Sequence, residues 1–480
     1  MNGIPPYCPP DSRYLKEWIP TIPLEEMAKH PYDVLIVGSG AGGGAALWRL
    51  CERLSGSGKR IAVVEAGDLL LPTHAMNVAT LSGFRAYEYF INPEISQPYG
   101  NLFPDLPGAR EVFALGGKTL FWTGVSPRFD ASELTGWPVS PNEMAHYYAI
   151  AEQVMNVTPS FGSPSSLQHL IIQRLRESGF PDAVAAPLAM NREPIQFGMH
   201  FSSISFLAYA LRHRPFELAV RSRAVRVLSD GRSVIGVEAM SQDKKTYRIR
   251  AQNVILSANS YETPRLLLHS GINGTAIGHY LVNHSRLFQV SSAIIRNASD
   301  LQSFVHVLIP HRAGSPYQIQ IGRIGIPDMN AATAPFIMAG FGKVETRYEN
   351  FLYLDPFRKD SYGVPLAQVQ FSYSDADIHV IRQTAEAMKR AWAGISGQSL
   401  SNDSNICLGL PGSDYHEAGT CRMGTDPRTS SANPFGQIHG VSGLYVADNS
   451  VLPSVGATNP TLTTVALAIR TADAIIHRLK

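Results

Sequence analysis

The sequence is poor in cysteine and modest in charge, and both shortages limit what the protein can be. The four cysteines (Cys8, Cys51, Cys407 and Cys421) have no metal-ligand spacing and are too few to cross-link 480 residues. This excludes a disulfide-stapled secreted domain, and we expect a protein of the reducing cytoplasm. Charged residues make up 17% of the chain and the formal net charge is +2. Because no long basic stripe occurs, we expect no nucleic-acid partner.

Long apolar runs are also missing. No segment reaches the roughly 20 apolar residues of a membrane-spanning helix. The N-terminus, MNGIPPYCPPDSRYLKEWIP, has two Pro-Pro pairs and charges where a signal peptide needs an apolar core. We therefore expect a soluble, unexported protein without a membrane span. Apolar residues account for 44% of the chain, which is typical of a globular protein that can bury a large ligand.

The N-terminal region has the pattern of a β-α-β unit. Residues 33–38 form a continuous apolar run typical of a parallel strand covered on both faces. Residues 45–54 have helical periodicity, and residues 60–64 indicate a second strand. Two more strand signals, at 254–257 and 444–447, come much later in the chain. We expect one doubly wound sheet assembled from these distant parts.

A second pattern occupies residues 285–412, where apolar and polar residues alternate as in an antiparallel sheet. Residues 375–395 follow as one long amphipathic helix. The predicted fold class is α/β: a Rossmann-like domain that binds a dinucleotide and a substrate domain with a mainly antiparallel sheet flanked by helices. We assign residues 31–155, 195–284 and 414–480 to the first domain, 156–194 and 285–413 to the second, and 1–30 to an N-terminal extension.

A nucleotide fingerprint lies between the first predicted strand and helix. Gly38, Gly40 and Gly43 have the spacing G-x-G-x-x-G, which suits a tight turn, a close approach of a pyrophosphate, and close packing of helix on strand. Glu65 ends the second strand, where its carboxylate can accept hydrogen bonds from both ribose hydroxyls and would repel a 2′-phosphate. NADP is therefore disfavoured, but the fingerprint alone leaves FAD and NAD open.

Four separated segments resemble the glucose-methanol-choline (GMC) oxidoreductase family. They are YDVLIVGSGAGGG at 32–44, ALGGKTLFWTGVSPRF at 114–129, NVILSANSYETPRLLLHSG at 253–271, and HEAGTCRMG at 416–424 together with GLYVADNSVLPSVGATNPTLTTVALAIR at 443–470. This resemblance implies FAD as cofactor. It places the following residues beside the cofactor: Gly117, Thr119, Trp122, Thr123, Val225, Asp448, Pro460 and Thr461.

Within the family, the second and last segments are most similar to pyranose 2-oxidases and bacterial glycoside oxidases. The fungal pyranose oxidases attach FAD through a histidine before the tryptophan, whereas Phe121 precedes Trp122 here. We therefore expect non-covalent FAD. The resemblance puts Thr123 near flavin N5 and Val225 at the adenine through its backbone. For Asp448, a turn aspartate is the alternative to a cofactor contact.

The same resemblance gives the catalytic pair, His416 and Asn459. A neutral imidazole can accept a hydroxyl proton near pH 7 while hydride leaves the adjacent carbon. Asn459 has two interpretations: an N-cap of the helix that follows, or a donor to the substrate hydroxyl. The positive end of that helix would stabilise charge that develops on the flavin.

Other histidines favour a structural interpretation. His284 and His439 have no companions at metal-ligand spacing, so we expect no metal site.

The predicted function is FAD-dependent oxidation of a secondary or primary alcohol on a sugar or glycoside ring. Hydride would pass to flavin N5 and a histidine would act as base. Electrons would then pass to oxygen, a quinone or another acceptor, and the sequence leaves the acceptor and the exact substrate open. The alternative is an FAD-dependent dehydrogenase of a non-sugar alcohol that uses an acceptor other than oxygen.

Overall fold

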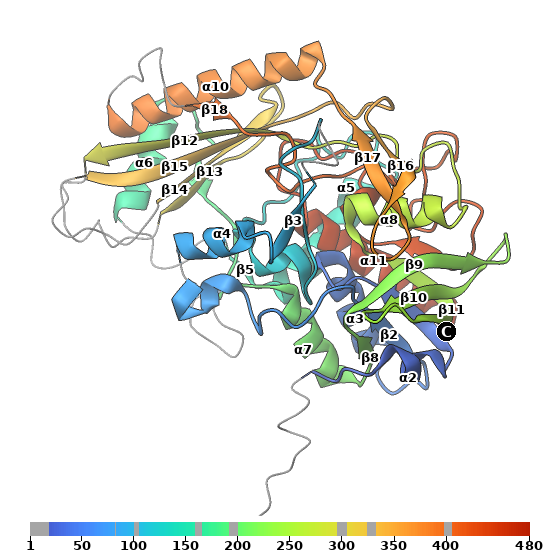
Figure 1. The fold of residues 1–480 in the computed structure, drawn as a ribbon. Helices are drawn as coiled ribbons and strands as arrows, with labels where there is room; N and C mark the ends of the chain where they lie inside the picture. Colours follow the sequence, from blue (N-terminus) through green and yellow to red (C-terminus); the bar gives the residue numbers. More distant parts are fainter. Residues whose placement is uncertain are drawn as a thin grey trace, which may run out of the picture.

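The larger sheet of the protein has a parallel centre (Figure 1). The computed structural model describes residues 19–81, 83–99, 105–158, 166–191, 200–294, 305–323, 333–397 and 406–480. The strands of the larger sheet are β1 (Tyr32–Val37), β2 (Ile61–Val64), β8 (Glu217–Ala219), β9 (Ser222–Ser229), β10 (Val234–Ser241), β11 (Thr246–Leu256) and β19 (Leu444–Val446). Parallel pairing joins β8, β2, β1, β11 and β19, while β10 and β9 continue from β11 in antiparallel pairing.

The predicted β-α-β unit is confirmed. It consists of β1, the helix α3 (Ala41–Arg53) and β2, and the four residues of β2 are all buried. The two late strand signals also join this sheet, because the C-terminal half of β11 pairs with β1 on one side and β19 on the other. The carboxyl ends of these parallel strands therefore meet at one edge, which is where ligands bind in open α/β sheets.

Helices pack around the larger sheet and its core. They are α2 (Leu24–Ala28), α3, α4 (Phe84–Ile91), α5 (Pro141–Val154), α7 (Ser203–His213), α8 (Asn259–His269) and α11 (Thr461–Leu479). Helix α3 packs against both α7 and α11. Most residues of α11 are buried, because a helix enclosed by its neighbours is apolar on nearly all sides.

The second sheet is antiparallel throughout its six strands, as the alternating pattern predicts. Its strands are β6 (Val184–Ala185), β12 (Ser285–Ile294), β13 (His306–Ile309), β14 (Tyr317–Arg323), β15 (Thr333–Gly342) and β18 (Cys407–Leu408). Helices α6 (Ser166–Glu177) and α10 (Asp375–Ser396) pack on one face of it (Figure 1). The fold class is thus confirmed.

Local sequence explains where α10 begins and ends. Ser374 and Asp377 form a capping box at its start, and Gly397 closes it in the left-handed conformation with φ of +69°. Its buried face includes Met388 and Trp392, which pack against the apolar side of β14 and β15. Since side chains alternate along a strand, the residues between those apolar ones point the other way, away from α10.

Three small antiparallel pairs and four short 3₁₀ helices complete the described fold. The pairs are β3 (Ser96–Pro98) with β4 (Arg110–Val112), β5 (Val157–Thr158) with β7 (Leu188–Ala189), and β16 (Phe351–Lys359) with β17 (Pro365–Gln370). The 3₁₀ helices are η1 (Ala75–Asn77), η2 (Ala79–Leu81), η3 (Gly117–Leu120) and η4 (Asn449–Val451). Leu352 and Val369 of the β16–β17 hairpin belong to the core of the larger sheet, although the hairpin falls in the segment that the sequence assigns to the substrate domain.

Part of the expected N-terminal extension belongs to the larger core. Ile19, Leu24 and Met27 are buried there, and Thr21 bridges to Leu218 at the sheet edge. Residues 1–18, and the expected domain boundary between residues 194 and 195, lie outside the described residues.

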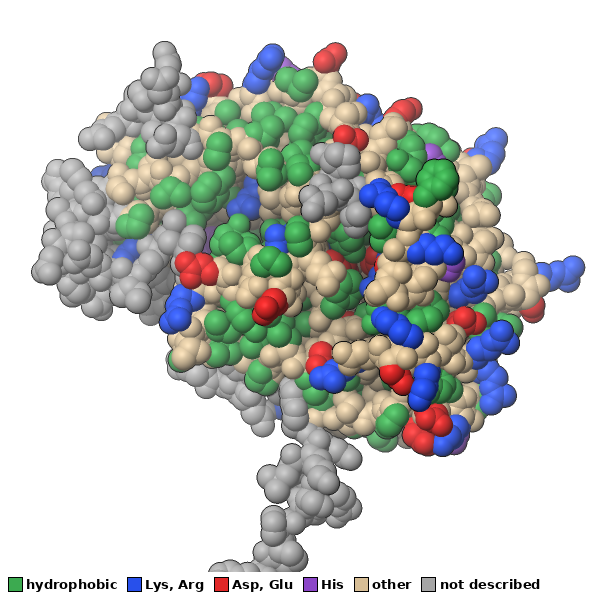
Figure 2. All heavy atoms as spheres, in the orientation of Figure 1, with side chains coloured by type: hydrophobic (Ala, Val, Ile, Leu, Met, Phe, Trp, Pro, Cys, Tyr) green, Lys and Arg blue, Asp and Glu red, His purple; other side chains and the backbone are tan. Residues whose placement is uncertain are grey.

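The surface carries charges of both signs. Lysine and arginine side chains alternate with aspartate and glutamate over the face drawn in Figure 2. Within the described ranges, no helix is both long enough and apolar enough to cross a membrane.

Candidate active site

The glycine turn after β1 has the geometry that a dinucleotide requires. Gly38 has φ of +93°, and a Cβ at this position would lie 2.3 Å from the Ser257 carbonyl oxygen. A Cβ at Gly43 would lie 2.0 Å from the Gly38 oxygen. At Gly40, by contrast, no described atom beyond its chain neighbours lies within 4 Å of such a Cβ. Gly38 and Gly43 therefore permit close packing, and Gly40 borders open space at the start of α3, which fits a pyrophosphate.

Glu65 lies beside this turn at the end of β2. Its carboxylate is buried and accepts hydrogen bonds from the backbone N–H of Ser39 at 2.9 Å, the Ser39 hydroxyl at 2.6 Å and the backbone N–H of Gly67 at 2.8 Å. Burial raises the pKa of Glu65 above its ordinary value, and these hydrogen bonds oppose that rise. A carboxylate has about four lone-pair sites, so these donors leave little capacity beyond one ribose hydroxyl.

The second sequence segment packs directly on the glycine turn. The backbone N–H of Gly116 donates to the Ser39 hydroxyl at 3.0 Å, and a Cβ at Gly117 would lie 3.6 Å from the Gly40 Cα. Thr119 is buried, and its hydroxyl donates to the Gly116 carbonyl at 2.6 Å. The structure thus brings together two segments that are far apart in the sequence.

Further along this segment, Trp122 is fixed from two sides. Its Nε1 donates to the Phe201 carbonyl at 2.7 Å, and its own carbonyl accepts from His74 Nε2 at 2.8 Å. Phe121 packs its ring on Phe90, with centroids 5.3 Å apart. Thr123 is exposed.

Asp448 lies where β19 ends against the turn. A Cβ at Gly42 would lie 1.6 Å from the Ala447 carbonyl oxygen, so only glycine lets α3 approach this strand. The Asp448 carboxylate accepts from the Asn259 backbone N–H at 3.0 Å, the Thr263 hydroxyl at 2.6 Å and the Ser450 backbone N–H at 2.9 Å. Burial raises the pKa of Asp448. The side chain caps η4, as the turn interpretation expects, and a cofactor contact remains a proposal.

Val225 occupies a bulge in β9. The pairing register with β10 passes from Arg226 to Ala224 and skips Val225. A bulged residue is left unpaired in the ladder, so the backbone of Val225 is suited to the adenine contact that the resemblance implies.

His416 and Asn459 meet beside β14 of the second sheet. Asn459 Nδ2 lies 3.2 Å from His416 Nε2. Asn459 Oδ1 accepts from the Nε2 atoms of Gln318 and Gln320, each at 2.6 Å. Both glutamines come from the face of β14 that is turned away from α10. The second sheet thus supplies the donors that orient the amide of Asn459.

The N-cap interpretation of Asn459 is wrong. The N-cap of α11 is Pro460, and within the described chain no side chain caps that end of the helix. The preceding loop is instead held by Glu133, which accepts from the backbone N–H groups of Ala457 at 2.8 Å and Thr458 at 3.2 Å. The N-terminus of α11, at Thr461, keeps its positive end beside the site.

The environment of His416 keeps its imidazole neutral. Its side chain is 13% exposed. Burial lowers the pKa of His416 well below its ordinary value of 6.5, and nearby His284, Arg286 and Lys118 lower it further. A neutral ring at pH 7 can accept a proton.

Two neighbours of His416 were not predicted from the sequence. The Nδ1 atoms of His284 and His416 lie 2.9 Å apart, and Asp414 Oδ2 lies 3.5 Å from His416 Nδ1. The expectation that His284 lacks metal-ligand companions is therefore wrong, since His284, Asp414 and His416 are grouped closely enough to hold an ion. The direct Nδ1–Nδ1 hydrogen bond accounts for this grouping without a metal. Asp414 lies two residues before His416, so the sequence did indicate that the two could be close. His284 is 132 residues away from His416, and nothing in the sequence indicated their contact.

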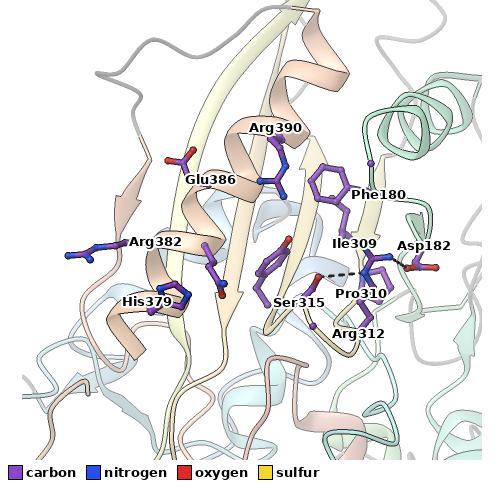
Figure 3. Close-up of a pocket in the computed structure, with 14 residues that line it drawn as sticks. Phe180, Asp182, Ile309, Pro310, Arg312, Ser315, His379, Arg382, Glu386 and Arg390 are labelled. Carbon is purple, nitrogen blue, oxygen red and sulfur yellow. Dashed lines mark hydrogen bonds and ion pairs between the residues drawn. The ribbon is translucent and has the colours of Figure 1, made fainter. Parts of the chain in front are cut away.

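A separate cavity of about 530 Å³ lies on the face of the second sheet that α10 covers (Figure 3). It lies between α10 and the β13–β14 hairpin, and its lining includes Arg312, Arg382 and Arg390. Tyr317 also lines it. Tyr317 precedes Gln318 on β14, so the two side chains point to opposite faces. The cavity is distinct from the His416 site.

Fold and site together define a nucleotide-binding oxidoreductase. The chain belongs to the GMC oxidoreductase family, whose N-terminal model matches residues 109–286 and whose C-terminal model matches residues 346–468. It is therefore an FAD-dependent oxidoreductase acting on CH–OH groups, as the resemblance in the sequence implies.

Several curated proteins are similar to the chain. C-glycoside 3-oxidase from Arthrobacter globiformis is 28% identical over 79% of this chain and 78% of its own. Pyranose 2-oxidase from Tricholoma matsutake is 24% identical over 78% of this chain and 74% of its own. 2-Methyl-1,2-propanediol dehydrogenase from Mycolicibacterium austroafricanum is 25% identical over 93% and 95%. Pyridoxine 4-oxidase from Mesorbium loti shares the fold, with a TM-score of 0.71 and 17% identity over 93% of this chain and 99% of that one.

Proposed function

We propose that the protein oxidises a secondary or primary alcohol carbon on a sugar or glycoside ring, with His416 as the base. FAD, when bound, supplies the hydride acceptor. Nε2 of His416 receives the proton of the substrate hydroxyl, and Asn459 Nδ2 donates to the hydroxyl oxygen. The observation that carries the proposal is the 3.2 Å pairing of these two atoms in a buried site.

The polar wall beside this pair supports a polyhydroxylated substrate. Gln318 is fully buried, and within the described chain its Oε1 atom has no hydrogen-bond partner. A buried acceptor without a partner costs about 1–3 kcal/mol, and a second hydroxyl of a sugar ring would satisfy it once the Gln318 amide turns toward the bound substrate. A simple alcohol has no such group. The similarity to a C-glycoside 3-oxidase and a pyranose 2-oxidase supports the same substrate class.

We further propose the domain division that the sequence suggests. Residues 31–155, 195–284 and 414–480 would hold FAD, and residues 156–194 and 285–413 would contribute the substrate side. In the first group we assign cofactor contacts to Gly38, Gly40, Gly43, Glu65, Gly117, Thr119, Trp122, Thr123, Val225, Asp448, Pro460 and Thr461. Support comes from the open space at Gly40 and from the packing of the second segment on the same turn.

The second candidate is a dehydrogenase of a non-sugar alcohol that passes electrons to an acceptor other than oxygen. It is favoured by the similarity to 2-methyl-1,2-propanediol dehydrogenase, which spans 93% of this chain. The two candidates differ in substrate class and in oxygen reactivity.

The test is an anaerobic titration of the FAD-loaded protein, followed by absorbance at the oxidised-flavin band. The panel contains free sugars, glycosides, amino sugars and simple alcohols. Bleaching by one sugar class, with simple alcohols inactive, is expected. Bleaching by non-sugar alcohols alone would support the dehydrogenase. Admitting oxygen afterwards and measuring hydrogen peroxide then decides whether oxygen is the acceptor.

A further inference from the structure

The contact between His284 and His416 constrains where their protons lie. The two Nδ1 atoms are 2.9 Å apart and the rings meet edge-on, with an interplanar angle of 82°. A hydrogen bond between two imidazole nitrogens needs one N–H donor and one bare acceptor. Either His284 or His416 therefore carries the shared proton.

The other ring nitrogen of His284 shows which of the two histidines carries the shared proton. His284 Nε2 lies 3.4 Å from the Val455 carbonyl oxygen, and a carbonyl can only accept, so Nε2 carries the proton. Burial lowers the pKa of His284 to about 4, so its ring is neutral at pH 7 and has a single proton. Nδ1 of His284 is then a bare acceptor, and His416 Nδ1–H is the donor.

The hydrogen bonds of Asn459 lead independently to the same tautomer of His416. Because Asn459 Oδ1 accepts from both Gln318 and Gln320, the amide turns its Nδ2 donor toward His416 Nε2. A donor facing Nε2 requires a lone pair on that atom. Both sides of the ring therefore assign the proton of neutral His416 to Nδ1.

The Asp414 carboxylate favours the same arrangement when the His416 ring gains a proton. Asp414 Oδ2 lies 3.5 Å from His416 Nδ1 and also accepts from the His284 backbone N–H at 3.1 Å. Arg286 and Lys118 oppose a positive charge on His416. The two acceptors near His416 Nδ1, which are His284 Nδ1 and Asp414 Oδ2, offset this unfavourable effect on the protonated ring.

We propose that His284 is a positioning residue that holds the His416 proton on Nδ1 and so reserves Nε2 for the substrate hydroxyl. When the hydroxyl O–H bond breaks, its proton adds to the Nε2 lone pair, while Nδ1–H keeps donating to His284. The assignment of Nε2 to the substrate rests on the proposed function. The tautomer itself does not.

The direct test is ¹⁵N NMR of the FAD-loaded protein labelled at histidine. The signals of His416 are assigned by their loss in His416→Gln. We expect the Nδ1–H tautomer for His416 and the Nε2–H tautomer for His284. An Nε2–H tautomer for His416 would overturn the proposal, whether or not a substrate has been found.

Two variants separate positioning from a merely structural role. His284→Asn keeps an acceptor near the Nδ1 position, whereas His284→Leu fills similar space without one. The rate of anaerobic cofactor reduction should fall about 10²- to 10⁴-fold in the leucine variant, the range of general-base catalysis. It should stay within about tenfold of wild type in the asparagine variant, which should also keep the Nδ1–H signal.

Equal losses in both variants, with the His416 tautomer unchanged, would show that His284 acts only as structure and would refute the proposal. A folded, FAD-loaded leucine variant with the wild-type rate would refute it too. If no alcohol reduces wild type, the proposed function fails, and the tautomer measurement still decides the state of the histidine pair.

Discussion

Alanine at Gly40 and at Gly43 should separate cofactor binding from folding, although the two positions are three residues apart. Gly40 has φ of −63° and ψ of −164°, which any residue adopts, and a Cβ there meets no described atom within 4 Å. A Cβ at Gly43 would meet the Gly38 oxygen at 2.0 Å and the Ser257 Cβ at 3.2 Å. The first methyl would occupy ligand space and the second would overlap the protein backbone.

The expected magnitudes follow from these contacts. Gly40→Ala changes the cap of α3 and the entropy of the unfolded chain, effects of about 1 kcal/mol or less that partly cancel. Gly43→Ala forces α3 away from the turn, and such overpacking costs about 1–3 kcal/mol or more. At Gly40, loss of one charge-assisted hydrogen bond to the pyrophosphate costs about 1.5–3 kcal/mol. The Kd for FAD should therefore rise about 10- to 100-fold.

Two measurements on apoprotein test this. Urea denaturation gives the free energy of unfolding, and the loss of FAD fluorescence on binding gives the Kd. Gly40→Ala should unfold like wild type and bind FAD weakly, whereas Gly43→Ala should unfold at lower urea. Wild-type FAD affinity in Gly40→Ala, or equal destabilisation by the two variants, would refute the assignment of Gly40 to the pyrophosphate.

Two further predictions concern the site. Burial, with a contribution from Glu417, raises the pKa of Asp414 to about 7. Protonation below that pH would remove the charge that balances protonated His416, so the rate of anaerobic cofactor reduction should fall as pH drops through about 7. Asp414→Asn should lose this fall in rate near pH 7 and keep only the fall that protonation of His416 causes below pH 6.5. Identical pH–rate profiles of wild type and Asp414→Asn would contradict the argument. Gln318→Leu should raise KM for sugars about tenfold by removing one hydrogen bond and leave KM for simple alcohols unchanged, because Gln320 still orients Asn459. Steady-state kinetics that show equal changes for both substrate classes would count against a sugar-binding role.

Local sequence was sufficient to predict much of this fold. The apolar run before Gly38 and the helical pattern after it locate β1 and α3 within a few residues, because both patterns reflect burial by near neighbours. The capped helix at 375–395 is recovered almost to its ends for the same reason. The alternation in residues 285–412 gives the antiparallel class of the second sheet.

Contacts between distant segments could not be predicted from the sequence. His284 carries no local signal of its proximity to His416, because the contact arises only when the start of β12 meets the loop before residue 416. Gln318 and Gln320 look like ordinary polar positions of a strand, yet they determine the orientation of Asn459. For Asn459 itself, the helix that follows left an N-cap open as the alternative to a substrate donor, and the structure decides against the cap because its Oδ1 atom accepts from the two glutamines.

The central claim is that Nε2 of His416 accepts the substrate proton. The most direct measurement is the anaerobic rate of flavin bleaching in wild type and in FAD-loaded His416→Ala, with the most active sugar or glycoside of the panel. A fall of about 10²- to 10⁴-fold with FAD binding unchanged is predicted. A variant that is bleached at the wild-type rate would contradict the account and place the base elsewhere.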